Sequence, residues 1–539
     1  MLSLVASCSA TLRIVKLYSD RPGESDGALS PTELSDQGAG RDDVVAVARY
    51  GRTVELQAPA LDAMARTAAV VDGFVHGDVP VYGVTTGFGS LASVVIPPDR
   101  TAELQLALLR SHAAGMGSEV EREVVRALMF LRARSLSLGY SGVRPVVAES
   151  LVAMLNAHIT PVVYEYGSLG ASGDLAPLAH IAMVLVGEGQ ARNADGELIT
   201  GAQALESAGL EPVVLREKEG LALINGTDGM LGMLCLALRD ITELLQVADI
   251  AAAMSVEALL GTDRAYAADL QALRPQLGQA VSAANLLRLL AGSPIVASHR
   301  LGDSRVQDAY SLRCTPQVHG AGRDTVAHAC LIADRELVSA IDNPMILPDG
   351  RVESCGNFHG APVGYVLDFL AIAVADLGAL AERRTDRMLD PARSWGLPPF
   401  LSPDAGVNSG MMIAHYTQAA MVSENRRLAV PASVDTMATS AMQEDHVSMG
   451  WSAARKLRAA IANLTRILAV ELTCAARAID LRQPLLPGAA TGAVLAVIRE
   501  QVAGPGPDRW LSPELAAVEQ LVLGGSITRA VTATIGELA

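Results

Sequence analysis

Apolar residues recur every three to four positions over much of this chain, a spacing that places them on one face of a helix. The pattern is clearest after about residue 100, where residues 101–110, 121–138 and 146–157 each carry it. Longer stretches of the same kind cover residues 230–260, 324–341, 363–388, 411–426 and 453–480. Several of these are about twice as long as an average helix. The pattern therefore predicts a mainly α-helical protein with long helices.

Helices that are apolar on nearly all sides must be covered on most of them. A central helix bundle, shared between subunits, meets this need. The letters "RTVEL" near residue 54 predict a short strand. Turn-rich segments interrupt the helical pattern at residues 83–89, 167–173, 226–229, 356–360 and 431–449. On a rigid helical scaffold, such loops are where chemistry is expected.

The chain divides into four regions by composition and pattern. Residues 1–42 end in a run rich in Ser, Gly, Asp and Pro, which predicts a disordered extension. Residues 43–230 mix short helical and turn-rich segments. Residues 231–480 hold most of the long helices, and residues 481–539 predict a C-terminal helical region.

Charge and hydropathy exclude some classes of function. The 539 residues carry a formal net charge of −16, which argues against nucleic acid as a partner because phosphate contacts need clustered Lys and Arg. The apolar stretch 364–380 is interrupted by Asp368 and Asp376. A bilayer span needs about 20 apolar residues, so we expect a buried core helix here and no membrane partner.

The cysteines and histidines point to a cytoplasmic protein without a metal site. The six cysteines are scattered, with no CxxC pair, as is typical of free thiols in a reducing cytosol. The spacing of His359, His415 and His446 fits no common zinc site.

The stretch "GSLGASGDLAPLAH" at residues 167–180 places a loop of small residues before an apolar run. It lacks the lysine of a phosphate-binding loop and the second glycine of a nucleophile elbow. In one interpretation, it is a turn whose Asp174 caps the following helix. In another, the Gly173 nitrogen attacks the Ala171 carbonyl and Ser172 loses water, which yields an electrophile made from the chain itself. The residues of the loop leave both interpretations open.

With its wider context, this stretch resembles the signature of the ammonia-lyase family that uses 4-methylideneimidazol-5-one (MIO). Colinear motifs support the resemblance from about residue 44 onward: "VYGVTTGFGSLA", "LLRSHAAGMG", "KEGLALINGTDGMLGML", "VQDAYSLRCTPQVHGAGRDT", "DNPMILPDGRVESCGNFHGAPV", "VNSGMMIAHYTQAA" and "SAMQEDHVSMGW". The resemblance implies a long central helix bundle of the aromatic amino acid lyase and fumarase-like type. The MIO loop would lie in a smaller, mixed N-terminal region. It also implies a homotetramer with active sites shared between subunits, and non-oxidative loss of ammonia from an amino acid. MIO would form from Ala171, Ser172 and Gly173, with no external cofactor.

The same resemblance assigns roles to individual side chains. Tyr82 would be the catalytic base, and its phenol would need activation by positive charge or dipoles. Arg313 would bind the substrate carboxylate, a role that suits the guanidinium fork. The other candidates are Gln307 and Tyr310 beside Arg313, Asn225 on the substrate amine or carboxylate, Phe358 as a wall of the ring pocket, Asn357 ordering the prosthetic group, and Gln443 touching the site. Each residue also has an ordinary structural role open to it, such as a turn Asn or a core Phe.

Two residues are expected to contact the side chain of the substrate. Glu444 stands where relatives that act on benzenoid amino acids carry no acid, and a carboxylate beside a benzene ring would be costly to bury. Beside an imidazole, it can accept an N–H or stabilise the cationic ring. Together with His112, it favours L-histidine, converted to trans-urocanate. Glu444 as an acid/base, a 2,3-aminomutase, a lyase acting on tyrosine or another aromatic amino acid, and a non-catalytic helical scaffold remain as alternatives.

Overall fold

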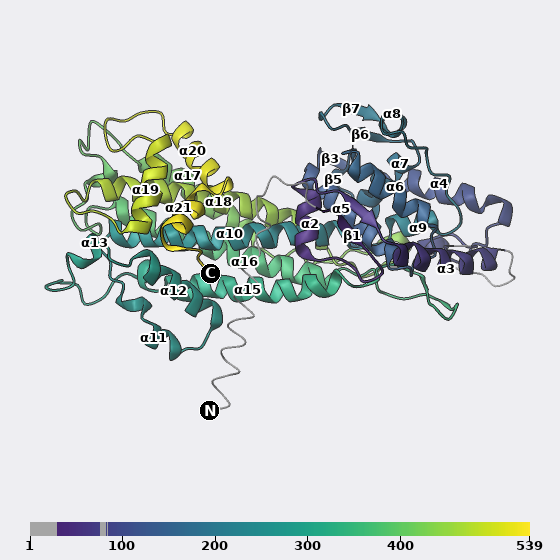
Figure 1. The fold of residues 1–539 in the computed structure, drawn as a ribbon, viewed down its shortest axis with the longest axis horizontal. Helices are drawn as coiled ribbons and strands as arrows, with labels where there is room; N and C mark the ends of the chain where they lie inside the picture. The colour runs from purple at the N-terminus through teal and green to yellow at the C-terminus, as the bar shows by residue number, and fades with distance from the viewer. Residues whose placement is uncertain (1–29, 76–81, 84) are drawn as a thin grey trace.

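Five long helices form the body of the molecule. The structure is a computed structural model that describes residues 30–75, 82–83 and 85–539. Helices α10 (Asp228–Ala258), α15 (Thr315–Glu336), α16 (Ala361–Leu389), α17 (Met412–Leu428) and α18 (Gly450–Asp480) pack along one another. They run along the long axis of the molecule (Figure 1). The predicted mainly helical bundle is confirmed.

Helices α10 and α18 lie at the centre of the bundle, and most of their residues are buried. Their many alanines leave little side-chain bulk between backbones. Several charged groups in the bundle interior bind one another, because an unpaired buried charge is costly. Arg384 binds Glu471, which also accepts from the Ser255 hydroxyl at 2.7 Å.

The predicted boundaries of α10, α16, α17 and α18 lie within three residues of the observed ones, whereas α15 begins nine residues before the expected start. Its first turns contain polar side chains, His319 and Arg323, that break the apolar periodicity. Both are buried, because the carboxylate of Asp249 binds each of them at 2.7 Å. Buried polar pairing therefore explains this error.

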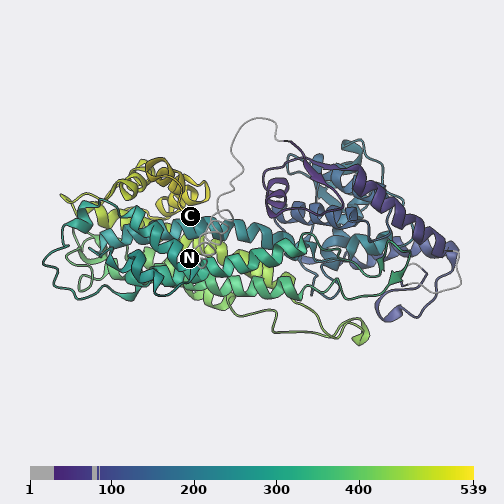
Figure 2. The same ribbon diagram turned by 60° about the horizontal axis from the view of Figure 1, so that its bottom comes forward.

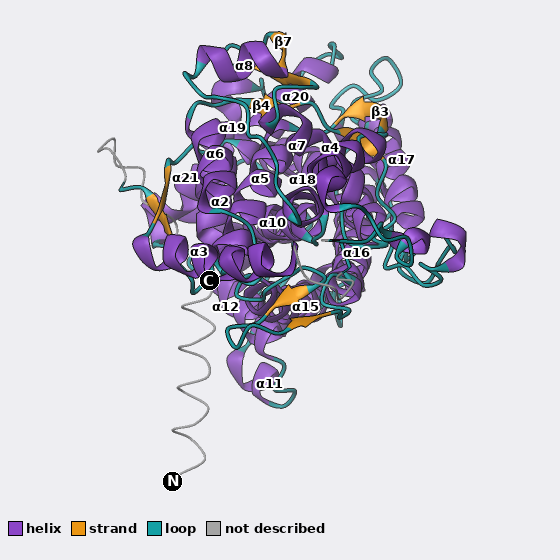
Figure 3. Cartoon of the chain, turned by 90° about the vertical axis from the view of Figure 1, so that its right-hand side faces the viewer, coloured by secondary structure: helices purple, strands orange, loops and turns teal. Residues whose placement is uncertain are grey.

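The N-terminal part packs at one end of the bundle, as the views along and across the long axis show (Figures 1 and 3). Its helices are α2 (Arg41–Ala48), α3 (Ala58–Val75), α4 (Thr101–His112), α5 (Arg122–Ser137), α6 (Pro145–Asn156), α7 (Leu175–Leu185), α8 (Gly201–Ser207) and α9 (Glu219–Ile224). At the opposite end lie the short helices α11 (Ala268–Ala272), α12 (Leu277–Leu289), α13 (Pro294–Ala297) and α14 (Tyr310–Arg313). There too lie α19 (Ala489–Gln501), α20 (Ser512–Leu523) and α21 (Ser526–Ile535).

The strands are short and peripheral. β1 (Thr32–Leu34) pairs in parallel with β2 (Val54–Leu56), and β3 (Met116–Glu119) pairs antiparallel with β5 (Tyr164–Tyr166). β4 (Thr160–Pro161), β6 (Gln190–Arg192) and β7 (Leu198–Thr200) form an antiparallel sheet, and β8 (Met345–Ile346) pairs with β9 (Val352–Glu353). β2 is the strand predicted near residue 54. β1 falls inside the predicted disordered extension, of which residues 1–29 lie outside the described residues.

By length and composition, α16 and α18 could each cross a bilayer, but most of each apolar stretch is buried inside the bundle. Helix α16 contains the apolar stretch that we expected to be a core helix, and its Asp368 accepts from the backbone amide of Ser433 at 2.8 Å.

Candidate active site

The loop between β5 and α7 contains the predicted electrophile precursor, Ala171, Ser172 and Gly173. Gly173 has a φ of +79° and forms an isolated bridge with Gly226. A Cβ on Gly173 would lie 1.9 Å from the Gly226 carbonyl oxygen, so no other residue fits here. Ala171 and Ser172 are half-buried, between the buried residues Gly170 and Gly173. The tripeptide is thus held on a bent backbone and keeps partly accessible side chains.

Asp174 ties this loop to the central bundle. It occupies the N-cap position of α7, but its side chain makes no capping hydrogen bond there. Instead its carboxylate accepts from the Met230 amide at 2.9 Å, in the first turn of α10, and from the Ser168 hydroxyl at 3.0 Å. Complete burial raises the pKa of Asp174 to about 7. The expectation that Asp174 caps the helix that follows it is therefore wrong, because its side chain caps α10.

The start of α18 holds the other side of the loop. The Met449 amide donates to the Leu169 carbonyl at 3.0 Å, and the Ser448 amide donates to the Gly170 carbonyl at 3.4 Å. The Trp451 indole donates to the Glu165 carbonyl at 2.8 Å. The loop is consequently fixed between two long helices that are far from it in sequence.

Tyr82, His112 and Glu444 form a group on this side of the molecule. The Tyr82 hydroxyl accepts from the Gly89 amide at 3.0 Å, and its ring meets Phe88 edge-on. Burial raises the pKa of Tyr82, the Glu444 charge adds to this, and the Gly89 amide opposes it. Among the described residues that shift this pKa, only the Gly89 amide lowers it. This one backbone dipole therefore gives the only activation expected of a base.

His112 ends helix α4, and its Nδ1 contacts the Leu108 carbonyl at 2.9 Å. Burial lowers the pKa of His112, whereas the Leu108 carbonyl and the negative charge of Glu444 oppose that change. Glu444 accepts from the Thr439 hydroxyl at 2.8 Å. A Cβ on Gly89, whose amide binds the Tyr82 hydroxyl, would lie 3.8 Å from the Glu444 carboxylate, so Glu444 lies close to Tyr82.

The segment that carries Glu444 connects α17 to α18 and leaves the bundle on its way (Figure 2). It returns to the N-terminal part, where the Ser90 amide donates to the Ser440 hydroxyl at 3.1 Å. Thr439 and Glu444 pair their backbones across the turn, on which Gln443 is exposed. Gln443 is therefore a solvent-exposed neighbour of Glu444.

Asn225 is buried in the turn between α9 and α10. Its Nδ2 donates to the Asp342 carboxylate and to the Asn343 carbonyl, both at 3.0 Å, and its Oδ1 has no hydrogen-bond partner. The Lys218 ammonium binds the other oxygen of Asp342 at 2.7 Å. The next residue, Gly226, forms the bridge to Gly173, so Asn225 lies beside the loop.

Asn357 and Phe358 lie in the loop between β9 and α16. Asn357 is exposed and Phe358 is half-buried. The neighbouring His359 ring stacks on His446, with centroids 5.5 Å apart. A Cβ on Gly360 would lie 3.1 Å from the Ser448 hydroxyl, so this loop borders the segment that holds the tripeptide. In the part of the chain that the structure describes, no group of three or more possible metal ligands occurs.

Gln307, Tyr310 and Arg313 lie elsewhere in the chain. Tyr310 and Arg313 are the first and last residues of α14, and Gln307 precedes it. The Tyr266 hydroxyl donates to the Leu312 carbonyl of this helix at 2.9 Å. The far end of α15 reaches the loop region, because Glu336 accepts from the Thr227 hydroxyl at 2.7 Å. The 22 residues of α15 span about 33 Å. A single chain therefore keeps these three residues about one long helix away from Asn225.

The α14 residues have an open environment of their own. The Arg313 guanidinium lies 4.7 Å from the centre of the Tyr310 ring, and Tyr310 is 71% exposed. Gln307 is exposed too, and Arg313 is half-buried. These side chains are accessible to a second molecule.

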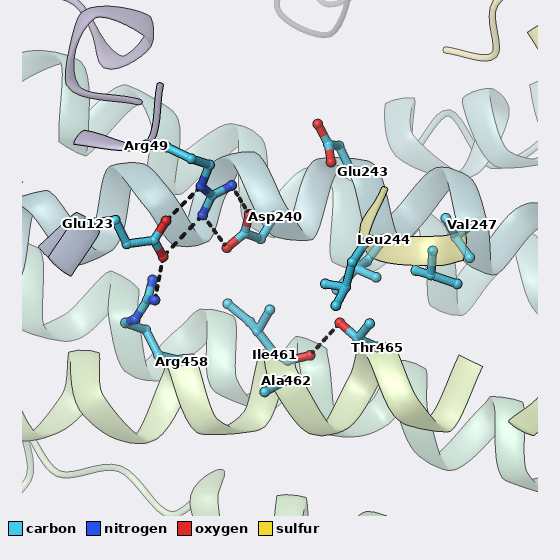
Figure 4. A pocket seen from close by; sticks show the side chains of 12 residues that line it. Arg49, Glu123, Asp240, Glu243, Leu244, Val247, Arg458, Ile461, Ala462 and Thr465 are labelled. Atoms are coloured by element: carbon cyan, nitrogen blue, oxygen red, sulfur yellow. Dashed lines mark hydrogen bonds and ion pairs between the residues drawn. The ribbon is translucent and has the colours of Figure 1, made fainter. Parts of the chain in front are cut away.

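A cavity of about 380 Å³ lies on the side of the bundle and away from the loop (Figure 4). Its charged side chains bind one another, since Arg49 contacts both Glu123 and Asp240, and Glu123 also contacts Arg458. The rest of its wall is largely apolar. These ion pairs join the helices around the cavity. We therefore place the candidate active site at the loop of residues 167–173 and not in this cavity.

Sequence reasoning missed three residues of this region, Lys218, Asp342 and Thr439. Lys218 lies in a run of four charged residues, 216–219, directly before the apolar part of α9, so the pattern does not single it out. Its partner is 124 residues away, which the sequence pattern does not reveal.

Residues 40–500 match the family model described as aromatic amino acid lyase. The chain belongs to this family, and it is a carbon–nitrogen lyase.

Individual relatives agree with this placement. The chain is 61% identical to a histidine ammonia-lyase from Streptomyces avermitilis over 498 residues, which cover 92% of this chain and 97% of the relative. A tyrosine aminomutase from Streptomyces globisporus superposes with a TM-score of 0.89 at 36% identity, covering 94% and 100% of the two chains. A histidine ammonia-lyase from Trypanosoma cruzi superposes with a TM-score of 0.86 at 37% identity, covering 94% and 96%.

Proposed function

We propose that this enzyme eliminates ammonia from L-histidine without oxidation and gives trans-urocanate, a first step of histidine degradation. The observation that carries the proposal is the position of Glu444 beside Tyr82, because the Gly89 amide donates to the Tyr82 hydroxyl at 3.0 Å and a Cβ on Gly89 would lie 3.8 Å from the Glu444 carboxylate. Burial lowers the pKa of His112, and the Glu444 charge opposes this change. A carboxylate and an imidazole suit a ring with N–H groups better than a benzene ring. The 61% identity to the Streptomyces avermitilis enzyme supports the same substrate.

The proposal includes formation of MIO from Ala171, Ser172 and Gly173. The fit rests on Gly173, whose positive φ and contact with Gly226 allow only glycine, and on the anchoring of the loop on both sides. When formed, this group supplies the electrophile that activates the substrate amine. No external cofactor and no metal are part of the proposal.

Other side chains of the protein take the proton and bind the substrate. Tyr82 takes the weakly acidic proton from the β-carbon. Glu444 accepts an N–H of the imidazole, and His112 contacts the ring. Phe358 and Gln443 bound the pocket, and Asn357 orders the loop. Asn225 hydrogen-bonds the substrate beside the tripeptide.

The substrate carboxylate needs Arg313, which lies about one long helix away in the same chain. We therefore propose that Arg313, Tyr310 and Gln307 of one subunit complete the site of another, in a homotetramer. The exposure of Gln307 and Tyr310, with Arg313 half-buried beside them, supports this role. An apolar row on α16, made of Tyr365, Phe369 and Ile372, is also exposed and offers a face for association.

A reducing cytosol is the compartment that we propose. The five cysteines in the part of the chain that the structure describes are all free: Cys235, Cys314, Cys330, Cys355 and Cys474. Free thiols are typical of such a compartment.

The test combines mass and activity of the purified wild-type enzyme and its Ser172→Ala variant. We expect the wild type to weigh less than its sequence by two water molecules per chain and to form urocanate from L-histidine. The variant should keep its full mass and its assembly and lose activity. A wild type of full mass that still forms urocanate would contradict the electrophile assignment.

The structural likeness to a tyrosine aminomutase raises one further candidate, in which ammonia returns to the β-carbon. Chromatography of the products separates the two, because only an aminomutase yields a β-amino acid.

A further inference from the structure

A buried polar cluster surrounds Asn225. Lys218, Asp342 and Asn225 are each at most 2% exposed. The Asp342 carboxylate accepts from the Lys218 ammonium through one oxygen, and from Asn225 Nδ2 and the Asn343 amide through the other. Arg132 fixes both chain segments, because it donates to the Asn225 and Ile341 carbonyls at 2.7 and 3.2 Å.

This cluster determines which end of the Asn225 amide is free. Both partners of Nδ2, the Asp342 carboxylate and the Asn343 carbonyl, accept hydrogen bonds and donate none. A flipped amide would place Oδ1 against two oxygens. The orientation therefore follows from the network, and it leaves Oδ1 buried and without a partner.

An acceptor that is buried without a donor costs about 1–3 kcal/mol, so a native structure retains one only for a reason. Asn225 is adjacent to Gly226, which pairs with Gly173 of the tripeptide. A donor that enters beside the tripeptide would satisfy Oδ1. The amino group of an α-amino acid is such a donor, whereas its carboxylate has none to give.

We propose that Lys218 and Asp342 are positioning residues that fix the Asn225 amide so that its Oδ1 accepts from the substrate amino group. Asn225 thus acts on the amine and not on the carboxylate. This inference rests on the proposed function only in that the substrate is an α-amino acid.

The variant Asp342→Asn inverts the arrangement. Lys218 still needs an acceptor, so the new amide turns its oxygen to Lys218 and its NH₂ group to Asn225. Two NH₂ groups would then face each other. Asn225 relieves this by flipping, which gives up its bond to the Asn343 carbonyl and presents its NH₂ to the site. In the double variant Lys218→Met/Asp342→Asn, the new amide is free to turn its oxygen back to Asn225. Asp349→Asn makes the same change at an exposed carboxylate of the same segment and is the matched control.

The readout is the inhibition constant of two substrate fragments on the assembled enzyme. Histamine keeps the amine and lacks the carboxylate, and 3-(imidazol-4-yl)propionate keeps the carboxylate and lacks the amine. In Asp342→Asn we expect histamine to bind about tenfold more weakly, the worth of one hydrogen bond, and the propionate to change by less than about threefold. The double variant should restore histamine binding to within about threefold, and Asp349→Asn should match the wild type.

Equal weakening of both fragments, a larger loss for the propionate, or no recovery in the double variant would overturn the proposal. If Asp342→Asn does not assemble, Asn225→Ala makes the same distinction, with histamine alone weakened. Turnover of the wild type decides the proposed function separately. If tyrosine is the substrate, tyramine and 3-(4-hydroxyphenyl)propionate replace the two fragments, and the same outcomes decide the role of Asn225.

Discussion

Replacing Glu444 by Gln removes one charge and keeps the size of the side chain. Gln retains an oxygen for the Thr439 hydroxyl, which donates to Glu444 at 2.8 Å. A hydrogen bond to a charged group contributes about 1.5–3 kcal/mol, and one between neutral groups contributes about 1 kcal/mol. The variant should therefore lose about 1–2 kcal/mol of binding to the imidazole in the transition state. This corresponds to a fall of about 5- to 30-fold in kcat/KM for histidine, measured by urocanate absorbance.

The same variant has a second readout, in the pH profile. Burial raises the pKa of Tyr82, and the Glu444 charge raises it further. A base must be ionised to take a proton, so activity increases as pH rises through this pKa. Without the Glu444 charge, the pKa is lower, and the acid limb of the kcat/KM profile should move to lower pH.

Thr439→Val is the control, because it removes the hydroxyl and keeps the charge on Glu444. It should leave the acid limb in place. A Glu444→Gln enzyme whose kcat/KM for histidine stays within about twofold of the wild type would refute the ring-binding role. An acid limb that moves to higher pH would refute the coupling to Tyr82.

Two further predictions concern the loop and the assembly. The raised pKa of Asp174, about 7, means that ionising its carboxyl costs stability as pH rises from about 4 to 7, by about 4 kcal/mol in full. Asp174→Asn should therefore raise Tm relative to the wild type more at pH 8 than at pH 5, and a pH-independent difference would contradict this. Ser172→Ala and Arg313→Ala chains should each be nearly inactive alone, but random mixed tetramers should regain about a quarter of the wild-type sites. No recovery on co-expression would refute the shared site.

The sequence predicts the bundle well because the fold repeats one simple pattern. Helices α10, α16 and α18 carry apolar residues on most faces, and their observed limits agree with the periodicity. The predicted start of α15 was wrong because His319 and Arg323 are polar but buried, where each binds the Asp249 carboxylate. Periodicity does not reveal polar residues that are buried by pairing.

The site follows less directly from the sequence. The motifs identified the tripeptide and its neighbours, but local reasoning assigned Asp174 to the wrong helix. Its partner, the Met230 amide, lies 56 residues away, and Asn225 and Asp342 are separated by 117 residues. Such contacts depend on how the segments pack, and local spacing does not encode them. The separation of Arg313 from Asn225 likewise emerges only from the length and direction of α15.

The most direct test of the account is a parallel assay of the purified enzyme with L-histidine and L-tyrosine, with each product identified by chromatography. The account predicts trans-urocanate and ammonia from histidine and little or no product from tyrosine. Turnover of tyrosine without turnover of histidine, or a β-amino acid as the product, would contradict it.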